Sequence, residues 1–414
     1  MSAAEKTTDE AGEPSWDLSF SAVKLKESAS LGGDVRLEIA PRTTVLVGKN
    51  GAGKSLLLEK MHAALRGSSD VLRMAEPDSA YFACEVDGQP QSATTNSIKL
   101  RYECRWRRRE ARPETSRTSA LPVTANADLK VEESCSLAND ANQLLWRTDD
   151  GVVRYGNGGR EEIAVGMTLL TWTISRGGRG AHLLPAVAND LANLFCSAIS
   201  VPAGIPRGDG ERDYLALPYP TPPRIHDPVE TRRIRWLAYT LVHWHETDRA
   251  LFDEFVALGR RVGLLDDVKV KLYRDPEETR TARSRDFATV LVDGTDFGLL
   301  SDGTLRVVEI LVWLIFPKRK LLLIEEPETA VHPGLLSKLL AEIDAYSTDR
   351  QIVLSTRSPH VVSWADPRAL RLVERHAGKT SVRSLREDEI GRVSAYLNDE
   401  GTLGDFVYSG ALDG

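Results

Sequence analysis

Cysteine is scarce in this sequence, with four residues in 414. Cys84, Cys104, Cys135 and Cys196 form no C-x-x-C pair and have no histidine partners at zinc-ligand spacing. This excludes a disulfide scaffold and a zinc site of the usual kind. We therefore expect a reduced, intracellular protein.

Long hydrophobic runs are also missing. The longest apolar stretches, such as Leu305–Phe316, contain charges or are too short to span a bilayer. Residues 1–15 are polar and acidic, unlike a signal peptide, and they are predicted to form a disordered leader. These absences predict a soluble, cytoplasmic protein without a membrane partner.

The chain does have enough apolar residues, 42% of the total, to bury a sizeable core. Short segments between residues 80 and 155 indicate a β-rich region, and a proline-rich loop at 201–228 precedes an amphipathic helical stretch. Strand and helix patterns then alternate, which favours an α/β fold on a mainly parallel, buried sheet. Residues 268–273 and 288–292 are expected among its strands.

A phosphate-binding loop is the clearest motif. Residues 48–55 read GKNGAGKS, match G-x-x-x-x-G-K-[ST] throughout, and lie between a strand pattern and a helix pattern. The glycines let backbone N–H groups turn towards phosphates, Lys54 can reach the β- and γ-phosphates, and the Ser55 hydroxyl can bind Mg²⁺. The candidate nucleotide ligands are Gly48, Asn50, Gly51, Gly53, Lys54, Ser55 and Leu56. A second GKT at 378–380 is rejected, because the first glycine of its motif would fall at Val373 inside a strand.

A buried-strand pattern at Leu321–Glu326 ends in two carboxylates. A carboxylate at such a strand end can hold the water shell of Mg²⁺, and its neighbour can position or deprotonate the attacking water. Glu325 is the metal candidate and Glu326 the hydrolytic one. Taken alone, a strand ending in two glutamates is more often the start of a solvated loop, so this interpretation depends on the other motifs.

Two further segments complete a resemblance. Residues 300–304, LSDGT, are similar to the signature loop of ABC-type ATPases, usually LSGGQ, and residues 351–359, QIVLSTRSP, to their switch strand, usually STHSP. The order of motifs resembles ABC-type heads of the SMC, RecF and OLD group. The segments LSDGTLR, EEPETAVHP and GTLGDFVYSGAL look like bacterial AAA/OLD-like ATPases. Residues 40–56 and 298–362 carry the likeness well, and the middle of the chain only weakly.

The resemblance implies an ABC-type P-loop NTPase head with a mainly parallel core sheet, an antiparallel β subdomain and an inserted β/helical region. The core would comprise residues 16–80 and 266–414, and the insertion residues 81–265. ATP and Mg²⁺ would be sandwiched between two heads, with Ser301 and Gly303 contacting the γ-phosphate held by the other subunit of a homodimer or higher homo-oligomer. The alternative is a monomer in which LSDGT only caps a helix.

Two positions depart from the family pattern. Glu325 stands where many relatives have aspartate, and Arg357 stands where they have the switch histidine. A guanidinium donates hydrogen bonds but cannot accept one from the attacking water. Arg357 is therefore predicted either to stabilise charge on the γ-phosphate or to mark hydrolysis that is slow or gated by a partner.

The expected function is that of an ATPase that regulates or scaffolds a separately encoded, nuclease-like effector in anti-phage defence. About fifty residues follow the switch strand, too few for the nuclease domain of OLD proteins. The alternatives are a RecF/SMC-like DNA-repair ATPase acting directly on DNA, a transporter subunit and a non-hydrolysing ATP sensor.

Three weaker patterns remain. Arg101, Arg105 and Arg107 would share one strand face and contact DNA phosphates or an acidic partner, although a solvated face is favoured slightly. His243 and His245 are predicted to be structural or solvated rather than metal ligands, because positions i and i+2 of a helix point to different sides. Gln89 and Gln91 are weak candidates for the Q-loop glutamine of the family.

Overall fold

The computed structural model describes residues 16–66, 79–90, 96–108, 129–138, 142–175, 186–201, 217–219, 229–273, 286–317, 319–398 and 402–408. The expected leader and most of the proline-rich loop lie outside these residues. The chain forms two compact units, Met1–Pro41 with Ala63–Ser197 and Arg42–His62 with Ala198–Gly414. The predicted division into core and insertion at residues 80 and 265 remains a prediction.

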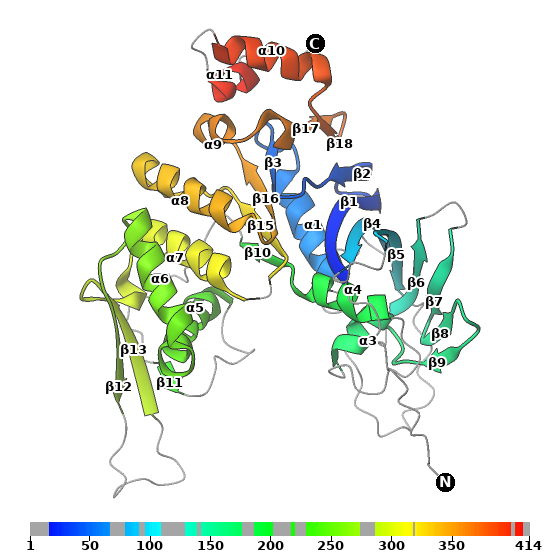
Figure 1. The fold of residues 1–414 in the computed structure, drawn as a ribbon, viewed down its shortest axis with the longest axis horizontal. Coiled ribbons are helices and arrows are strands. Elements are labelled where there is room, and N and C mark those ends of the chain that lie inside the picture. Colours follow the sequence, from blue (N-terminus) through cyan, green and yellow to red (C-terminus); the bar gives the residue numbers. More distant parts are fainter. Residues whose placement is uncertain are drawn as a thin grey trace, which may run out of the picture. The chain divides into compact units, whose positions relative to one another are not determined.

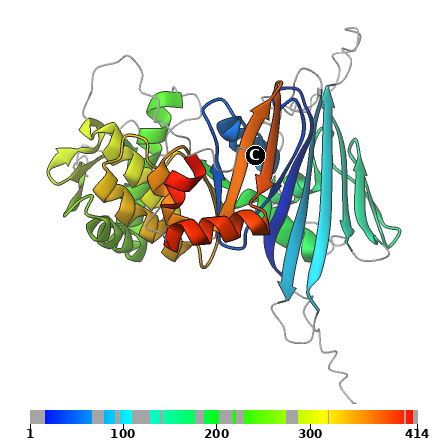
Figure 2. The ribbon, with the colours of Figure 1, turned by 90° about the horizontal axis from the view of Figure 1, so that it is seen from above.

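The first unit contains an antiparallel sheet in the order β2-β1-β4-β5-β6-β7-β8-β9 (Figure 1). Figure 2 shows its long strands β4 and β5 side by side. The strands are β1 (Trp16–Ser28), β2 (Gly33–Glu38), β4 (Ser79–Pro90), β5 (Ile98–Arg108), β6 (Leu129–Leu137), β7 (Leu144–Asp149), β8 (Val152–Tyr155) and β9 (Arg160–Glu162). This sheet joins the expected β-rich region at 80–155 with two strands that precede the phosphate-binding loop.

One face of the antiparallel sheet is buried because apolar side chains alternate with polar ones along each strand. Phe20, Phe82 and Tyr102 pack around Phe195 of helix α4 (Ala186–Cys196), with ring centroids 5.6, 6.1 and 4.9 Å away. Three cysteines on this unit, Cys84, Cys104 and Cys135, are buried and not disulfide-bonded.

Glu133 is a charged residue on the buried face of β6. Its Oε2 accepts hydrogen bonds from the Thr148 hydroxyl at 2.9 Å and from the Leu169 N–H at 2.6 Å, at the start of helix α3 (Leu169–Ser175). Burial raises the pKa of Glu133, and these hydrogen bonds only partly oppose the shift. The carboxylate therefore anchors the first turn of α3 to the sheet.

The second unit is built on a six-stranded sheet in the order β10-β15-β16-β3-β17-β18. The strands are β3 (Thr43–Val47), β10 (Ile199–Val201), β15 (Leu321–Glu325), β16 (Gln351–Thr356), β17 (Leu370–His376) and β18 (Lys379–Ser384). All neighbours pair in parallel except β17 and β18. Every residue of β16 is buried, as expected for a parallel strand covered on both faces. The expected α/β fold with a mainly parallel sheet is confirmed.

The described helices of this unit are α1 (Lys54–Arg66, whose last four residues belong to the first unit), α5 (Val229–Thr247), α6 (Arg249–Val262), α7 (Asp302–Ile315), α8 (Pro333–Tyr346), α9 (Pro359–Trp364), α10 (Glu387–Asn398) and α11 (Leu403–Tyr408). The amphipathic stretch expected before residue 265 is thus two helices. They separate at Asp248, whose side chain caps α6 by accepting the Leu251 N–H at 3.3 Å.

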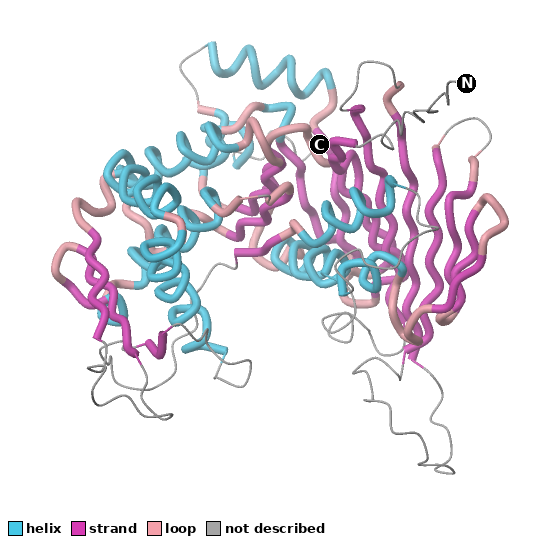
Figure 3. Tube along the Cα trace, turned by 60° about the horizontal axis from the view of Figure 1, so that its bottom comes forward, coloured by secondary structure: helices cyan, strands magenta, loops and turns pink. Residues whose placement is uncertain are grey.

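The placement of residues 268–273 and 288–292 in the parallel sheet is wrong. They lie in β12 (Val268–Tyr273) and β13 (Asp286–Val292), which pair antiparallel in a separate small sheet with β11 (Leu217–Tyr219) and β14 (Thr295–Asp296). Figures 1 and 3 show this sheet beside α5 and α6. Lys269 and Lys271 explain the difference, because a strand that alternates valine with lysine keeps one face in water, as antiparallel strands do.

Among the described residues, no helix is both long and apolar enough to cross a membrane.

Candidate nucleotide-binding site

Three neighbouring strands of the parallel sheet bring the predicted site residues to one edge. In the register of β15, β16 and β3, Glu325 pairs with Ser355, and Thr356 pairs with Val47. Parallel strands end at the same edge of a sheet, where open α/β folds bind ligands. Strands β15, β16 and β3 are neighbours in the sheet (Figure 1). The phosphate-binding loop, the two glutamates and Arg357 therefore lie at the ends of these three strands.

The loop after β3 closes around its own lysine. The buried Lys54 Nζ donates to the carbonyl oxygens of Gly48 at 2.6 Å and Lys49 at 3.3 Å. Gly51 and Gly53 have φ angles of 78° and 103°, which favour glycine. Helix α1 begins at Lys54, so its first N–H groups, which have no partner within the helix, lie at the loop.

Strands β17 and β18 support this loop from the second side of β3. A Cβ on Gly48 would lie 2.1 Å from the Val373 carbonyl oxygen, so only glycine fits there. The buried Thr380 hydroxyl donates to the Ala52 carbonyl oxygen at 3.1 Å. The rejected GKT segment is thus a turn and strand that holds the phosphate-binding loop, rather than a second loop of the same kind.

Charged side chains at the ends of β15 and β16 act on Lys54. Burial lowers the pKa of Lys54, the carboxylates of Glu326, Glu328 and Glu325 oppose this shift, and the Arg357 guanidinium adds to it. These groups therefore lie within electrostatic reach of one another, inside the second unit.

Glu326 has a left-handed backbone conformation, with φ at 43°, which residues other than glycine rarely adopt. Its N–H donates to the Ser355 carbonyl oxygen at 2.8 Å, which ties this left-handed turn to β16. Its carboxylate accepts from the Thr329 hydroxyl at 3.2 Å and lies 3.5 Å from the Arg357 Nε. The hydrolytic candidate and the arginine at the switch position are thus in contact.

Glu328 belongs to the same cluster, although no sequence motif indicates it. Its Oε1 accepts from the Thr356 hydroxyl at 2.7 Å and from the Arg357 N–H at 3.0 Å. The only signal available was a third acidic residue in EEPE. Its partners, 28 and 29 positions further along the chain, could not be read from that spacing.

The LSDGT segment forms the start of α7. Ser301 is exposed and caps the helix, with its Oγ accepting the Thr304 N–H at 3.2 Å. A Cβ on Gly303 would lie 2.1 Å from the Ala330 carbonyl oxygen. The glycine therefore allows the start of α7 to pack directly on the segment that follows the two glutamates.

Arg306 connects α7 to the end of β15. Its buried guanidinium donates to the carbonyl oxygen of Glu325 and, at 3.3 Å, to that of Val201. It also lies 3.6 Å from Glu309, which Arg233 of α5 binds at 3.0 Å. Burial lowers the pKa of Arg306 to about 10.

The basic stripe lies on β5 of the first unit. Arg101, Arg105 and Arg107 alternate with buried residues, as the pattern predicts. Arg105 forms an ion pair with Glu27. Arg101 lies opposite Glu85 on β4, whose carboxylate is bound by Arg36 at 2.9 Å. Arg101 and Arg107 are exposed, so this face of β5 is in water.

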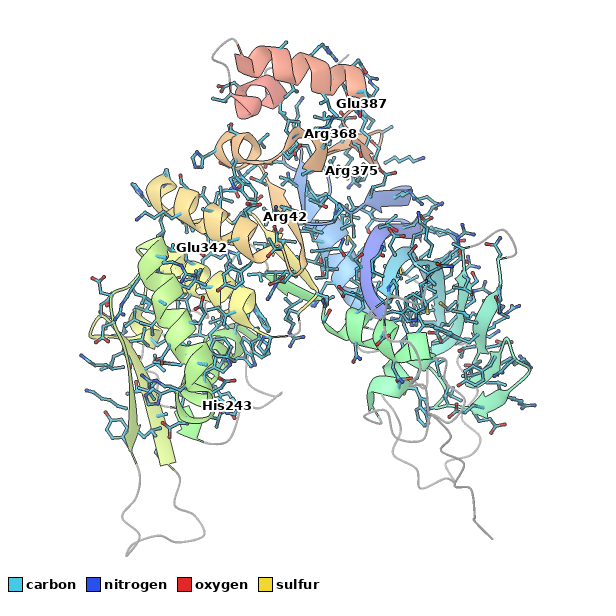
Figure 4. The ribbon with its side chains drawn as sticks, viewed as in Figure 1. Arg42, His243, Glu342, Arg368, Arg375 and Glu387 are labelled. Atoms are coloured by element: carbon cyan, nitrogen blue, oxygen red, sulfur yellow. The ribbon has the colours of Figure 1, made fainter. Side chains whose placement is uncertain are left out.

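The remaining candidates are two glutamines and two histidines. Gln89 is exposed on β4 of the first unit, and Gln91 lies outside the described residues. His243 is exposed on α5 (Figure 4), whereas the His245 Nδ1 lies 2.8 Å from Glu246 Oε1. In the part of the chain that the structure describes, no three histidine, cysteine or acidic side chains are grouped to hold a metal.

Residues 231–363 match a family model described as "AAA domain, putative AbiEii toxin, Type IV TA system". This match supports a P-loop ATPase. It runs from α5 to α9 and includes Ser301, Glu325, Glu326 and Arg357, but it covers less than half of the chain and not the phosphate-binding loop. No curated protein sequence matches the chain.

Solved structures that match this chain include three SMC heads. The SMC head domain from Thermotoga maritima is 14% identical with a TM-score of 0.40, covering 89% of this chain and 99% of its own. A second is the Smc head domain with an extended coiled coil bound to the C-terminal domain of ScpA, derived from Pyrococcus furiosus. It is 11% identical with a TM-score of 0.46, and the match covers 92% of this chain and 100% of that one. A third is the Smc head domain with a coiled coil and joint, derived from Pyrococcus yayanosii. It is 10% identical with a TM-score of 0.45, and the match covers 92% of this chain and 100% of that one.

Proposed function

We propose that this chain binds and hydrolyses ATP at the edge of its parallel sheet. The observation that supports this most is the register of β3, β16 and β15, which joins a complete phosphate-binding loop to Glu325, Glu326 and Arg357. The charged groups at the ends of β15 and β16 also shift the pKa of Lys54, so the motifs lie around one site.

Each residue has a chemical role in this proposal. Lys54 and the loop N–H groups bind the phosphates. Ser55 and Glu325 would hold Mg²⁺, which neutralises phosphate charge. The exposed Ser55 hydroxyl and the partly exposed Glu325 carboxylate suit this hard cation, which prefers oxygen ligands. Glu326 orients the attacking water, and Arg357 donates to the γ-phosphate as charge develops.

Calorimetry with ATP and Mg²⁺ tests the binding site. Lys54→Ala removes a charged donor to phosphate, so affinity is expected to fall by about ten- to a hundredfold. Lys379→Ala is the matched control, because it changes the exposed lysine of the GKT segment that does not form a phosphate-binding loop. Equal affinity of the Lys54→Ala variant and the unsubstituted protein would refute the site.

We further propose that ATP joins two copies of the chain. Ser301 and Gly303 would contact the γ-phosphate bound by the second copy, and hydrolysis would release the pair. The exposed Ser301 at the N-terminus of α7 supports this, since N–H groups at a helix start favour an anion. Glu326→Gln, which removes the base, should trap a dimer with ATP in light scattering. An unchanged mass would refute ATP-driven pairing.

In the cell we propose a cytoplasmic ATPase that switches or assembles a separately encoded, nuclease-like effector in anti-phage defence. The resemblance of LSDGTLR and EEPETAVHP to AAA/OLD-like ATPases supports this. Purification with its neighbouring gene product tests it, and absence of a bound effector in both nucleotide states would count against it.

The second candidate is a RecF/SMC-like ATPase that acts on DNA directly. The shared face of Arg101, Arg105 and Arg107 favours it. Salt-dependent DNA binding that Arg105→Glu with Arg107→Glu abolishes would support this candidate over the first.

A further inference from the structure

Glu328 joins the turn that follows β15 to the end of β16. It lies two residues after Glu326 in the turn that follows β15, and its Oε1 accepts hydrogen bonds from the Thr356 hydroxyl at 2.7 Å and the Arg357 N–H at 3.0 Å. Both donors lie at the end of β16. One carboxylate oxygen therefore fixes the backbone from which the Arg357 side chain departs.

The arginine at that point contacts the hydrolytic candidate. Its Nε lies 3.5 Å from Glu326 Oε2, and its side chain is 53% exposed, against 17% for Glu326. An exposed guanidinium on a flexible stem gains little from a single ion pair of this kind. Its backbone therefore needs an anchor if it is to stay beside Glu326, and Glu328 supplies one.

We propose that Glu328 is a positioning residue for ATP hydrolysis, which holds Thr356 and Arg357 so that the Arg357 guanidinium stays beside Glu326. This inference rests on the proposed function. It assigns no contact between Glu328 and the nucleotide, since Glu328 acts through Arg357.

A second observation indicates that this carboxylate belongs to the site rather than to the core. Glu328 Oε2 is buried, and among the described residues it has no hydrogen-bond partner. A tie to two donors needs a single acceptor oxygen, and a buried carboxylate oxygen without a partner is costly. The hydrogen bonds to Thr356 and Arg357 through Oε1 do not account for this second oxygen.

Single-site variants test the inference through the split between binding and turnover. Glu328→Ala removes the acceptor, so kcat should fall by about ten- to a hundredfold while the ATP affinity stays within about twofold. Glu328→Gln keeps an acceptor oxygen and should retain turnover within about threefold of the unsubstituted chain. Thr356→Val removes one of the two donors, so its kcat should fall several-fold. This variant keeps the inference testable if Glu328→Ala does not fold.

A double-mutant cycle separates positioning from mere stabilisation. If Glu328 acts through Arg357, adding Glu328→Ala to Arg357→Ala should slow turnover by less than about threefold further. Glu342→Ala is the control, because Glu342 on α8 (Figure 4) is tied to Arg261 by a similar double contact at 3.0 and 3.3 Å and lies outside the site residues. Its kcat should be unchanged.

The outcomes are distinct. An unsubstituted protein that binds no ATP or releases no phosphate would overturn the proposed function, and this inference with it. An active protein whose Glu328→Ala variant turns over normally would overturn the inference alone. So would a Glu328→Gln variant as slow as Glu328→Ala, or independent losses in the double mutant.

Discussion

Gly48→Ala tests the packing of the phosphate-binding loop against β17. The added Cβ would lie 2.1 Å from the Val373 carbonyl oxygen, whereas carbon and oxygen atoms in contact are about 3.3–3.6 Å apart. The loop or the strand must therefore move by more than about 1 Å. Overpacking of this kind costs about 1–3 kcal/mol, which lowers the unfolding temperature of a unit of this size by about 2–12 °C.

The same movement displaces the Gly48 carbonyl oxygen from Lys54 Nζ, which lie 2.6 Å apart, so ATP affinity should fall as well. Thermal unfolding by circular dichroism and calorimetry with ATP measure the two effects. Gly391→Ala on α10 is the control, because its Cβ would meet no atom within 4 Å and alanine favours a helix by up to about 1 kcal/mol. An unfolding temperature for Gly48→Ala equal to that of the unsubstituted chain would refute the reasoning.

Two further predictions concern buried charges. Because folding raises the pKa of Glu133 above its ordinary value of 4.5, the folded chain holds this proton more tightly, and stability falls as the pH rises through the raised pKa. Glu133→Gln should shrink that fall in a pH series of thermal unfolding, and an unchanged slope would contradict it. Arg306→Met should cost about 3–5 kcal/mol in urea unfolding, because it breaks a buried ion-pair cluster. The exposed Arg249→Met control should cost less than about 1 kcal/mol, and a similar loss in both would contradict the burial argument.

Local chemistry made much of the site predictable. The strand, loop and helix around Lys54 are contiguous in sequence, and the buried strand before Glu325 has its own apolar pattern. The structure brings these segments to one edge, with Arg357 beside Glu326. The roles of these residues in binding and hydrolysis remain predictions.

Long-range pairing limited the rest. Alternation in β1 and β2 indicated strands, but not that they share a sheet with β4 to β9, because β3 and α1 intervene in the chain. The contact of Glu328 with Thr356 depends on the same kind of pairing. In β12 the signal was present, since Lys269 and Lys271 already indicated a face in water.

The parallel pairing of β3 has a consequence for synthesis on the ribosome. Every strand of the antiparallel sheet lies within residues 16–162, so that sheet can form early. Strand β3, although it lies between β2 and β4 in the chain, pairs with β16 and β17, about 300 residues later. At about 5–20 residues per second, it waits roughly 15–60 s for its partners. Nascent chains stalled before residue 351 should therefore resist proteolysis in the antiparallel sheet while remaining unable to retain ATP.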